Sequence, residues 1–296
     1  MITQYKYKPG LFFGLTFLIT WVCWFGAAYL SHRPGMEMTA GGLLGLGLLG
    51  PLAACLIMMA ISGSRELRRD FRNKLFKITL IKPVYLPMIF LFMPAAIALS
   101  IVLSTLFGQS LEQLLFASEI SIVDGCPLLS LLIPFLAPAL EELGWSGYGI
   151  DSLKSRHKHF ATALIFGLAW SLWHLPLFFV HGYYHYNILN ESPVYALNFF
   201  ISVIPMTILT NWLYFKNNRS IIAAIIFHVV VVMSSEIFMV TNQTKCMVTI
   251  VISLFAAWVI MRDRQFFFGD QSMISSGNKE FEKLPALKTA IDTGLN

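Results

Sequence analysis

Charged residues are scarce in this sequence, since Asp, Glu, Lys and Arg make up only 12% of its 296 residues. In soluble domains, about 25% of all residues are of these four types. Hydrophobic residues reach 56%, and the mean hydropathy is +0.67. This balance excludes a soluble globular protein and predicts a polytopic membrane protein with the lipid bilayer as its surroundings. No soluble segment interleaves basic and aromatic residues, so we predict no nucleic-acid partner.

Cysteine is also rare, with four residues, no C-x-x-C pair and no histidine nearby at ligand spacing. This pattern does not indicate a disulfide framework or a cysteine-ligated zinc site, although a single bridge between Cys126 and Cys246 is an alternative. The H-E-x-x-H motif of soluble zinc proteases is absent as well. We predict that the cysteines are small apolar packing residues: Cys23, Cys55, Cys126 and Cys246.

Long apolar runs fill most of the sequence. A helix that spans a bilayer takes about 20 mostly apolar residues. Eight such runs are present, at about 11–30, 41–62, 84–107, 127–150, 160–180, 194–215, 220–240 and 247–261. We therefore predict an all-α membrane bundle over residues 1–262, followed by a polar cytoplasmic tail over residues 263–296 with a short interfacial piece and then disorder.

Basic residues fall almost entirely on one side of this topology. Of the 21 Lys and Arg residues, only Arg33 and Lys245 lie on the other side. The positive-inside rule then places both termini in the cytoplasm of a multi-pass protein of the cell membrane. The densest basic run, over 64–77, has amphipathic spacing, which predicts a segment lying on the anionic cytoplasmic leaflet. A solvated positive loop is the alternative.

Two adjacent carboxylates, Glu141 and Glu142, interrupt the fourth apolar run. An acidic residue at the centre of a spanning helix costs about 2.5 to 3.5 kcal/mol on insertion. An ionisable residue at this depth is by default a functional-site hypothesis. The alternative is a buried polar cluster that ties helices together.

Two histidines lie at a similar depth to this pair. Counting about 1.5 Å per residue from the predicted helix ends places Glu141, His174 and His228 at overlapping depths. Such a group can activate water through a carboxylate base, with imidazoles that hold the water or donate to an oxyanion. Alternatively, two histidines and one glutamate can bind zinc with an open position for water. The sequence leaves both routes open, and both lead to hydrolysis.

Three motifs carry a family resemblance. Glu141-Glu142, the aromatic-x-x-x-His pattern from Trp170 to His174, and the later His228 resemble the CAAX-protease and bacteriocin-processing family, called CPBP or Abi. The family consists of intramembrane glutamate-dependent endopeptidases, some described as metalloproteases. They cleave near the C-termini of prenylated proteins in eukaryotes and are tied to peptide processing and bacteriocin immunity in bacteria. The resemblance implies a core at about 127–240.

The resemblance also implies roles for four residues. Glu141 would activate the water, and Glu142 would support it or share its proton. His174 would help to activate or position the water, and His228 would stabilise the oxyanion or complete a metal site. If a metal such as zinc is used, Glu141, His174 and His228 would be its ligands; no other cofactor is predicted. The substrate would be a membrane-associated peptide or protein.

Two positions differ from the family pattern. Ser146 stands where the family usually has arginine, and Val232 where it usually has Asn or Asp. These differences motivate a second hypothesis, a catalytically impaired member acting as a membrane scaffold or bacteriocin-immunity factor. A third hypothesis is a proton-coupled transporter that uses the same carboxylates. The run Gly144-Trp145-Ser146-Gly147 also matches the G-x-S-G of rhomboid serine proteases, but that interpretation leaves the glutamates unexplained.

Overall fold

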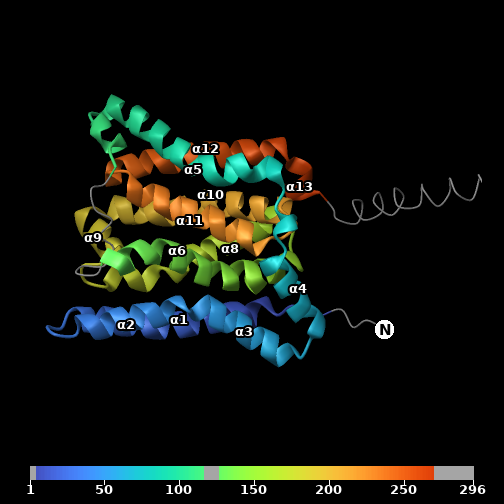
Figure 1. Ribbon diagram of the computed structural model, residues 1–296. Helices are drawn as coiled ribbons and strands as arrows, with labels where there is room; N and C mark the ends of the chain where they lie inside the picture. Colours follow the sequence, from blue (N-terminus) through green and yellow to red (C-terminus); the bar gives the residue numbers. More distant parts are fainter. Residues whose placement is uncertain (1–4, 117–126, 270–296) are drawn as a thin grey trace, which may run out of the picture.

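The structure, a computed structural model, is a bundle of long helices that run side by side (Figure 1). It describes residues 5–116 and 127–269. Among these residues, regular structure is helical apart from one isolated bridge between Phe116 and Phe238. Helices pair their own backbone N–H and C=O groups, and a hydrocarbon layer offers those groups no other partners. The predicted all-α membrane helix bundle is confirmed.

The helices vary greatly in length. The α-helices before the middle of the chain are α1 (Pro9–Ser31), α2 (Glu37–Leu48), α3 (Gly50–Ser62), α4 (Arg65–Phe76), α5 (Leu86–Ser104), α6 (Pro127–Gly144) and α7 (Ile150–Lys154). Those that follow are α8 (His159–Trp173), α9 (Tyr184–Glu191), α10 (Pro193–Lys216), α11 (Ile221–Ile237), α12 (Asn242–Arg262) and α13 (Arg264–Phe268). The shorter elements are the 3-10 helices η1 (Ile78–Leu80), η2 (Pro83–Tyr85), η3 (Thr105–Phe107), η4 (Leu111–Leu114) and η6 (Leu175–Phe179), and the π-helical turn η5 (Trp145–Gly149).

Among the described helices, five are long and apolar enough to cross a membrane, and α2 with α3 would make a sixth span. The sequence predicted one continuous helix over 41–62, but α2 and α3 meet at a bend of 42°. Pro51, in the first turn of α3, explains this break at Leu49 because proline has no N–H with which to continue the ladder from α2. The shorter apolar helix α11 and the helix α6 pack in the same bundle. The count of eight spans stays a prediction.

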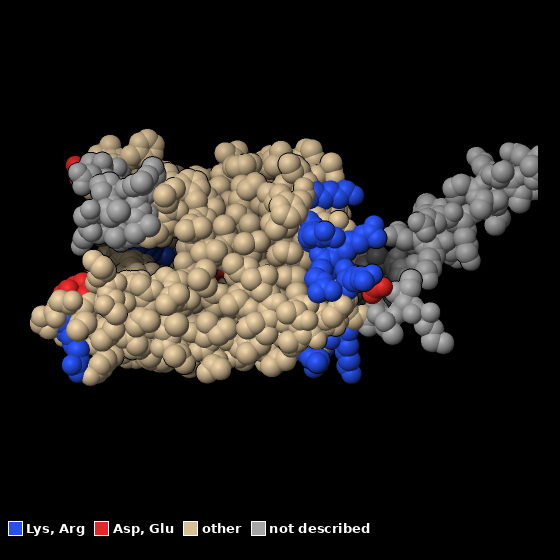
Figure 2. All heavy atoms as spheres, turned by 60° about the horizontal axis from the view of Figure 1, so that its bottom comes forward, with Lys and Arg blue, Asp and Glu red and all other residues tan. Residues whose placement is uncertain are grey.

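Both described ends of the chain lie at one end of the bundle, together with α4 (Figure 1). The backbone N–H of Lys8 donates to the Tyr148 hydroxyl, and Lys158 donates to the carbonyl of Phe268 in α13. Most of the Lys and Arg atoms visible in Figure 2 gather at this end, which we call the basic end. α13 lies in the segment that was predicted to begin with an interfacial piece; its contact with a membrane interface stays a prediction, and the predicted disorder falls outside the described residues. Assigning the basic end to the cytoplasm stays a prediction.

α6 occupies an interior position, because it packs against α3 on one side and α11 on another. The π-helical turn η5 that continues it is buried along its whole length. Its two large aromatic residues, Trp145 and Tyr148, are fully buried in a cluster with side chains of α1, α3 and α8. The C-terminal end of α6, which carries the two glutamates, is thereby held inside protein rather than in lipid. That location is the one expected of ionisable residues at membrane depth.

Candidate active site

Close backbone packing fixes the end of α6. A Cβ atom on Gly144 would lie 2.2 Å from the carbonyl carbon of Pro51, so only glycine lets α6 rest directly on α3. A Cβ atom on Gly147 would lie 2.8 Å from a ring carbon of Phe71 in α4. The segment that follows the glutamates is therefore clamped between α3 and α4. Here the helix widens into η5, a distortion that is often found at functional sites.

Glu141 is buried and is held by two tryptophans. The indole N–H groups of Trp170 and Trp145 donate to its Oε2 at 2.9 and 3.3 Å. No hydrogen bond from the described part of the chain reaches its Oε1. Hydropathy alone indicates packing or lipid-facing roles for tryptophans in apolar runs, but these two also donate hydrogen bonds to a buried carboxylate. They fix the Glu141 carboxylate through one oxygen and leave the other available.

Glu142 is also buried, but both of its oxygens are engaged. The Ser146 hydroxyl donates to Oε2 at 2.5 Å, and His228 Nδ1 lies 3.2 Å from Oε1. Because the carboxylate can only accept, Nδ1 of His228 is the protonated nitrogen when Glu142 is ionised. Neighbouring residues of a helix point about 100° apart. The two glutamates therefore have different neighbours despite being adjacent in the sequence.

His174 lies just beyond the end of α8, although the sequence placed it inside a continuous helix over 160–180. Pro176 explains this difference, because proline favours a break in the helix before it, and η6 begins at Leu175. Nδ1 of His174 lies 2.8 Å from the Trp170 carbonyl, to which it must donate. This bond leaves Nε2 of the neutral ring as an acceptor. The ring stacks on that of His185, with centroids 5.6 Å apart.

A cavity of about 320 Å³ joins these groups. Glu141, His174 and His228 all line it, whereas Glu142 is absent from its described lining. Val232, one helical turn after His228, lines it as well. The remaining walls come from α5, α9, α10, α11 and α12 and are mostly apolar, with Asn198, Ser202, Ser235, Glu236 and Lys245 among the polar exceptions. The three predicted residues thus share one partly open cavity in which water and a peptide could meet.

The arrangement does not fit the zinc site that the sequence left open. Among the described residues, no group of three or more His, Cys, Asp or Glu side chains is placed to hold a metal ion. Of the three predicted ligands, His228 is engaged by Glu142 through Nδ1, and Glu141 is held by two indoles through Oε2. We therefore derive no chemical step through a metal.

Ser146 is a further residue whose role the sequence did not predict. It is fully buried, and its hydroxyl donates to Glu142. It does not line the cavity among the described residues, so the rhomboid-like pattern around it does not place a nucleophile there. A signal for its contact was present, because residues four apart on a helix are neighbours. Trp170 had a signal too, since it begins the aromatic-x-x-x-His motif.

Known proteins resemble this chain over most of its length. Residues 124–234 match the family model described as type II CAAX prenyl endopeptidase Rce1-like. This range contains all four predicted site residues and overlaps the predicted core at 127–240. The chain is also 45% identical over 273 residues to a CAAX prenyl protease 2 of Methanococcus maripaludis, an alignment that covers 90% of this chain and 98% of that relative. The chain therefore belongs to the Rce1-like CAAX prenyl endopeptidase family of proteases.

Proposed function

We propose that this protease hydrolyses a peptide bond of a membrane-associated protein or peptide in the cavity, with water activated by Glu141. The uneven use of the two Glu141 oxygens carries the proposal. Two indoles hold Oε2, while Oε1 receives no hydrogen bond within the described residues. A carboxylate that is fixed by one oxygen and free at the other can bind a water molecule and take its proton.

The reaction then follows in two proton transfers. Water gives a proton to Glu141 while its oxygen attacks the scissile carbonyl carbon, which forms a tetrahedral intermediate. The carbon–nitrogen bond breaks as Glu141 returns the proton to the leaving amine. The carboxylate is regenerated, and the products are a new carboxyl group and a new amine.

The imidazoles supply position and charge in this scheme. His174 accepts a hydrogen bond from the water at Nε2, because its Nδ1–H is committed to the Trp170 carbonyl. His228 acts as an imidazolium that donates one N–H to Glu142 and the other to the oxyanion. Glu142 therefore supports His228, and Glu141 alone is the base.

The class of substrate follows from the relative rather than from a contact. That protein is called a CAAX prenyl protease. We propose that this chain acts on a prenylated C-terminal peptide in the cell membrane, with the lipid group in the bilayer and the peptide in the cavity. The mostly apolar cavity walls suit aliphatic side chains next to the scissile bond.

A catalytically impaired scaffold or immunity factor remains a second candidate because of one observation. Val232 lines the cavity where the family pattern usually has the polar side chain of Asn or Asp. Cells carrying Glu141→Ala separate the two proposals. A phenotype that survives this change would favour the scaffold, and a phenotype that is lost would favour the enzyme.

The decisive test uses purified chain in vesicles with a prenylated, internally quenched peptide. Glu141→Gln should lower kcat by at least about 10³, within the range of a general base. Glu142→Gln should lower it less, because this carboxylate only supports His228. Glu37→Gln, on the exposed start of α2, is the control and should match wild type. Unchanged turnover by the Glu141 variant would overturn the assignment.

A further inference from the structure

Lys74 is a buried cation at the basic end of the bundle. Only 2% of its surface is exposed, whereas Arg65, Arg68, Arg69 and Arg72 on the same helix are exposed. The sequence had grouped all of these cations on one surface, which is wrong for Lys74. Burying an unpaired ammonium group costs several kcal/mol. Its location therefore requires partners inside the protein.

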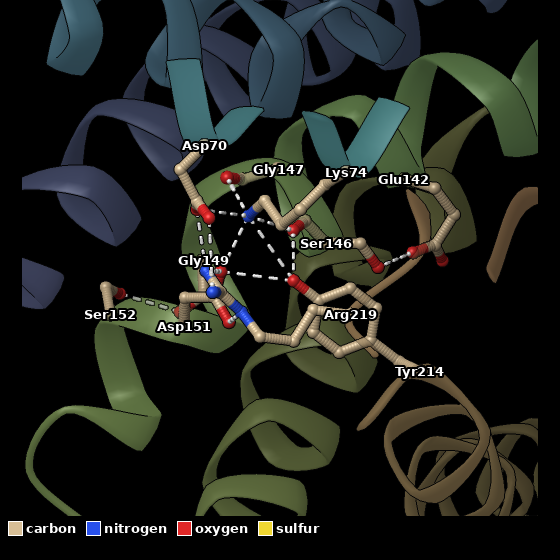
Figure 3. A network of polar contacts seen from close by, with 10 residues as sticks. All are labelled: Asp70, Lys74, Glu142, Ser146, Gly147, Gly149, Asp151, Ser152, Tyr214 and Arg219. Carbon is tan, nitrogen blue, oxygen red and sulfur yellow. Dashed lines mark hydrogen bonds and ion pairs between the residues drawn. The ribbon is translucent and has the colours of Figure 1, made fainter. Parts of the chain in front are cut away.

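Most of those partners belong to the segment that follows the glutamates, and Asp70 and the Tyr214 hydroxyl complete the set (Figure 3). Lys74 Nζ donates to the carbonyls of Ser146 and Gly147 at 3.2 and 3.0 Å, and to Asp151 Oδ2 at 2.6 Å. The Tyr214 hydroxyl also donates to the Ser146 carbonyl, at 2.9 Å. Two donors from different helices thus fix the peptide unit of Ser146.

The charges around Lys74 are balanced. Arg219 binds Asp151 and makes a two-point contact with Asp70. Burial alone would raise the pKa of Asp151, but the charges of Lys74 and Arg219 hold this pKa below its usual value. Arg219 has a φ of 65°, in the left-handed region that a side chain of its size rarely occupies. The fold accepts this strain at the turn that brings Arg219 to Asp151.

The network leads directly to the reacting groups. The Ser146 hydroxyl donates to Glu142, and Glu142 holds His228. Three contacts therefore connect Lys74 to the imidazole that faces the cavity: Lys74 to the Ser146 carbonyl, Ser146 to Glu142, and Glu142 to His228. The contact of Lys74 with Ser146 is made through the backbone carbonyl alone. Lys74 therefore affects Glu142 by positioning Ser146, and does not place its charge beside the Glu142 carboxylate.

We propose that Lys74 is a positioning residue for the hydrolysis, which rests on the function proposed above. From α4 it holds the widened turn η5 so that the Ser146 hydroxyl reaches Glu142, which keeps His228 oriented toward the cavity. The alternative is that Lys74 only anchors α4 to the bundle. If Lys74 were only an anchor, replacing it would lower the stability of the fold, and its effect on kcat would not depend on whether Ser146 is present.

A double-mutant cycle separates the two roles, because groups that act through one another give non-additive effects. Lys74→Met should lower kcat about 10-fold with KM within twofold, as for the loss of one hydrogen bond to a charged group. Lys74→Arg should recover part of this loss. Ser146→Ala should lower kcat by a similar factor, and the double variant should be no slower than Ser146→Ala alone. Arg72→Met, on the exposed face of α4, is the matched control and should behave as wild type.

The Glu141→Gln variant is measured before the cycle. Loss of turnover in that variant supports the proposed function, so a failure of the proposed function is distinguished from a failure of the positioning role. Wild-type kcat in Lys74→Met, or effects of Lys74→Met and Ser146→Ala that multiply, would overturn the positioning role. If Lys74→Met does not give folded protein, Tyr214→Phe removes the other donor to the Ser146 carbonyl. It should show the same non-additivity with Ser146→Ala, and multiplied effects would again refute the proposal.

Discussion

Replacing Val232 with asparagine should make this enzyme faster. Val232 lies four residues after His228, about 6 Å along the helix axis, and both residues line the cavity. An amide at this position can donate to an oxyanion beside His228. One such donor is worth about 10² to 10³ in kcat where it belongs to an evolved site. Because the cavity at position 232 accommodates valine rather than an amide, we expect a smaller gain in kcat of about 10-fold, which is about 1.4 kcal/mol.

The matched control is Val232→Leu, because leucine has nearly the shape of asparagine without its amide. Both variants are compared with wild type by cleavage of a quenched prenylated peptide in vesicles, with kcat and KM determined separately. A donor that acts only in the transition state raises kcat and leaves KM unchanged. If Val232→Asn is no faster than Val232→Leu, an oxyanion does not form beside this turn of α11.

Three further predictions concern the groups around the site. Trp170→Phe should lower kcat about 10-fold, because it removes the shorter indole hydrogen bond to Glu141. Trp145→Phe removes the longer bond and should lower kcat less. Equal turnover in wild type and both variants would contradict this role of the indoles. Because the pKa of Asp151 is lowered from 3.8, its stabilising effect is complete above that pH and is lost only as the pH falls through the lower folded value. The Tm difference between wild type and Asp151→Asn should thus stay constant from about pH 5 to about pH 9, and a difference that shrinks within that range would contradict the pairing. Treatment with a zinc chelator should leave kcat unchanged, since the described residues form no metal-ligand group, whereas a loss that zinc restores would contradict the metal-free mechanism.

Sequence alone predicted the fold class and three residues that share the cavity. The apolar runs predicted the helices because a bilayer requires long segments with few charges. Glu141, His174 and His228 could be grouped because helix rise converts sequence position into depth. Depth carries no information on which neighbours point at a side chain. The separate environments of Glu141 and Glu142 could therefore not be predicted.

The missed residues share a physical reason. Lysine is usually a surface residue, and only the packing of α4 on η5 shows that Lys74 is buried. Trp145 and Trp170 have large apolar rings, so hydropathy assigns them to packing and ignores their single N–H donors. The break before His174 had a local signal in Pro176, and the bend after Leu48 had one in Pro51. Both prolines were present in the sequence, but length and hydropathy outweighed them.

The serine at position 146 changes what holds Glu142, not whether it is held. An arginine there would bring a positive charge to the carboxylate. In this chain a hydroxyl and an imidazole occupy its two oxygens, and the buried Lys74 contacts the backbone of the same serine. The carboxylate thus depends on His228 for compensating charge, which couples the protonation of His228 to Glu142. His228 must be an imidazolium to donate to both Glu142 and an oxyanion. The presence of serine rather than arginine at position 146 therefore links Glu142 more closely to the reaction.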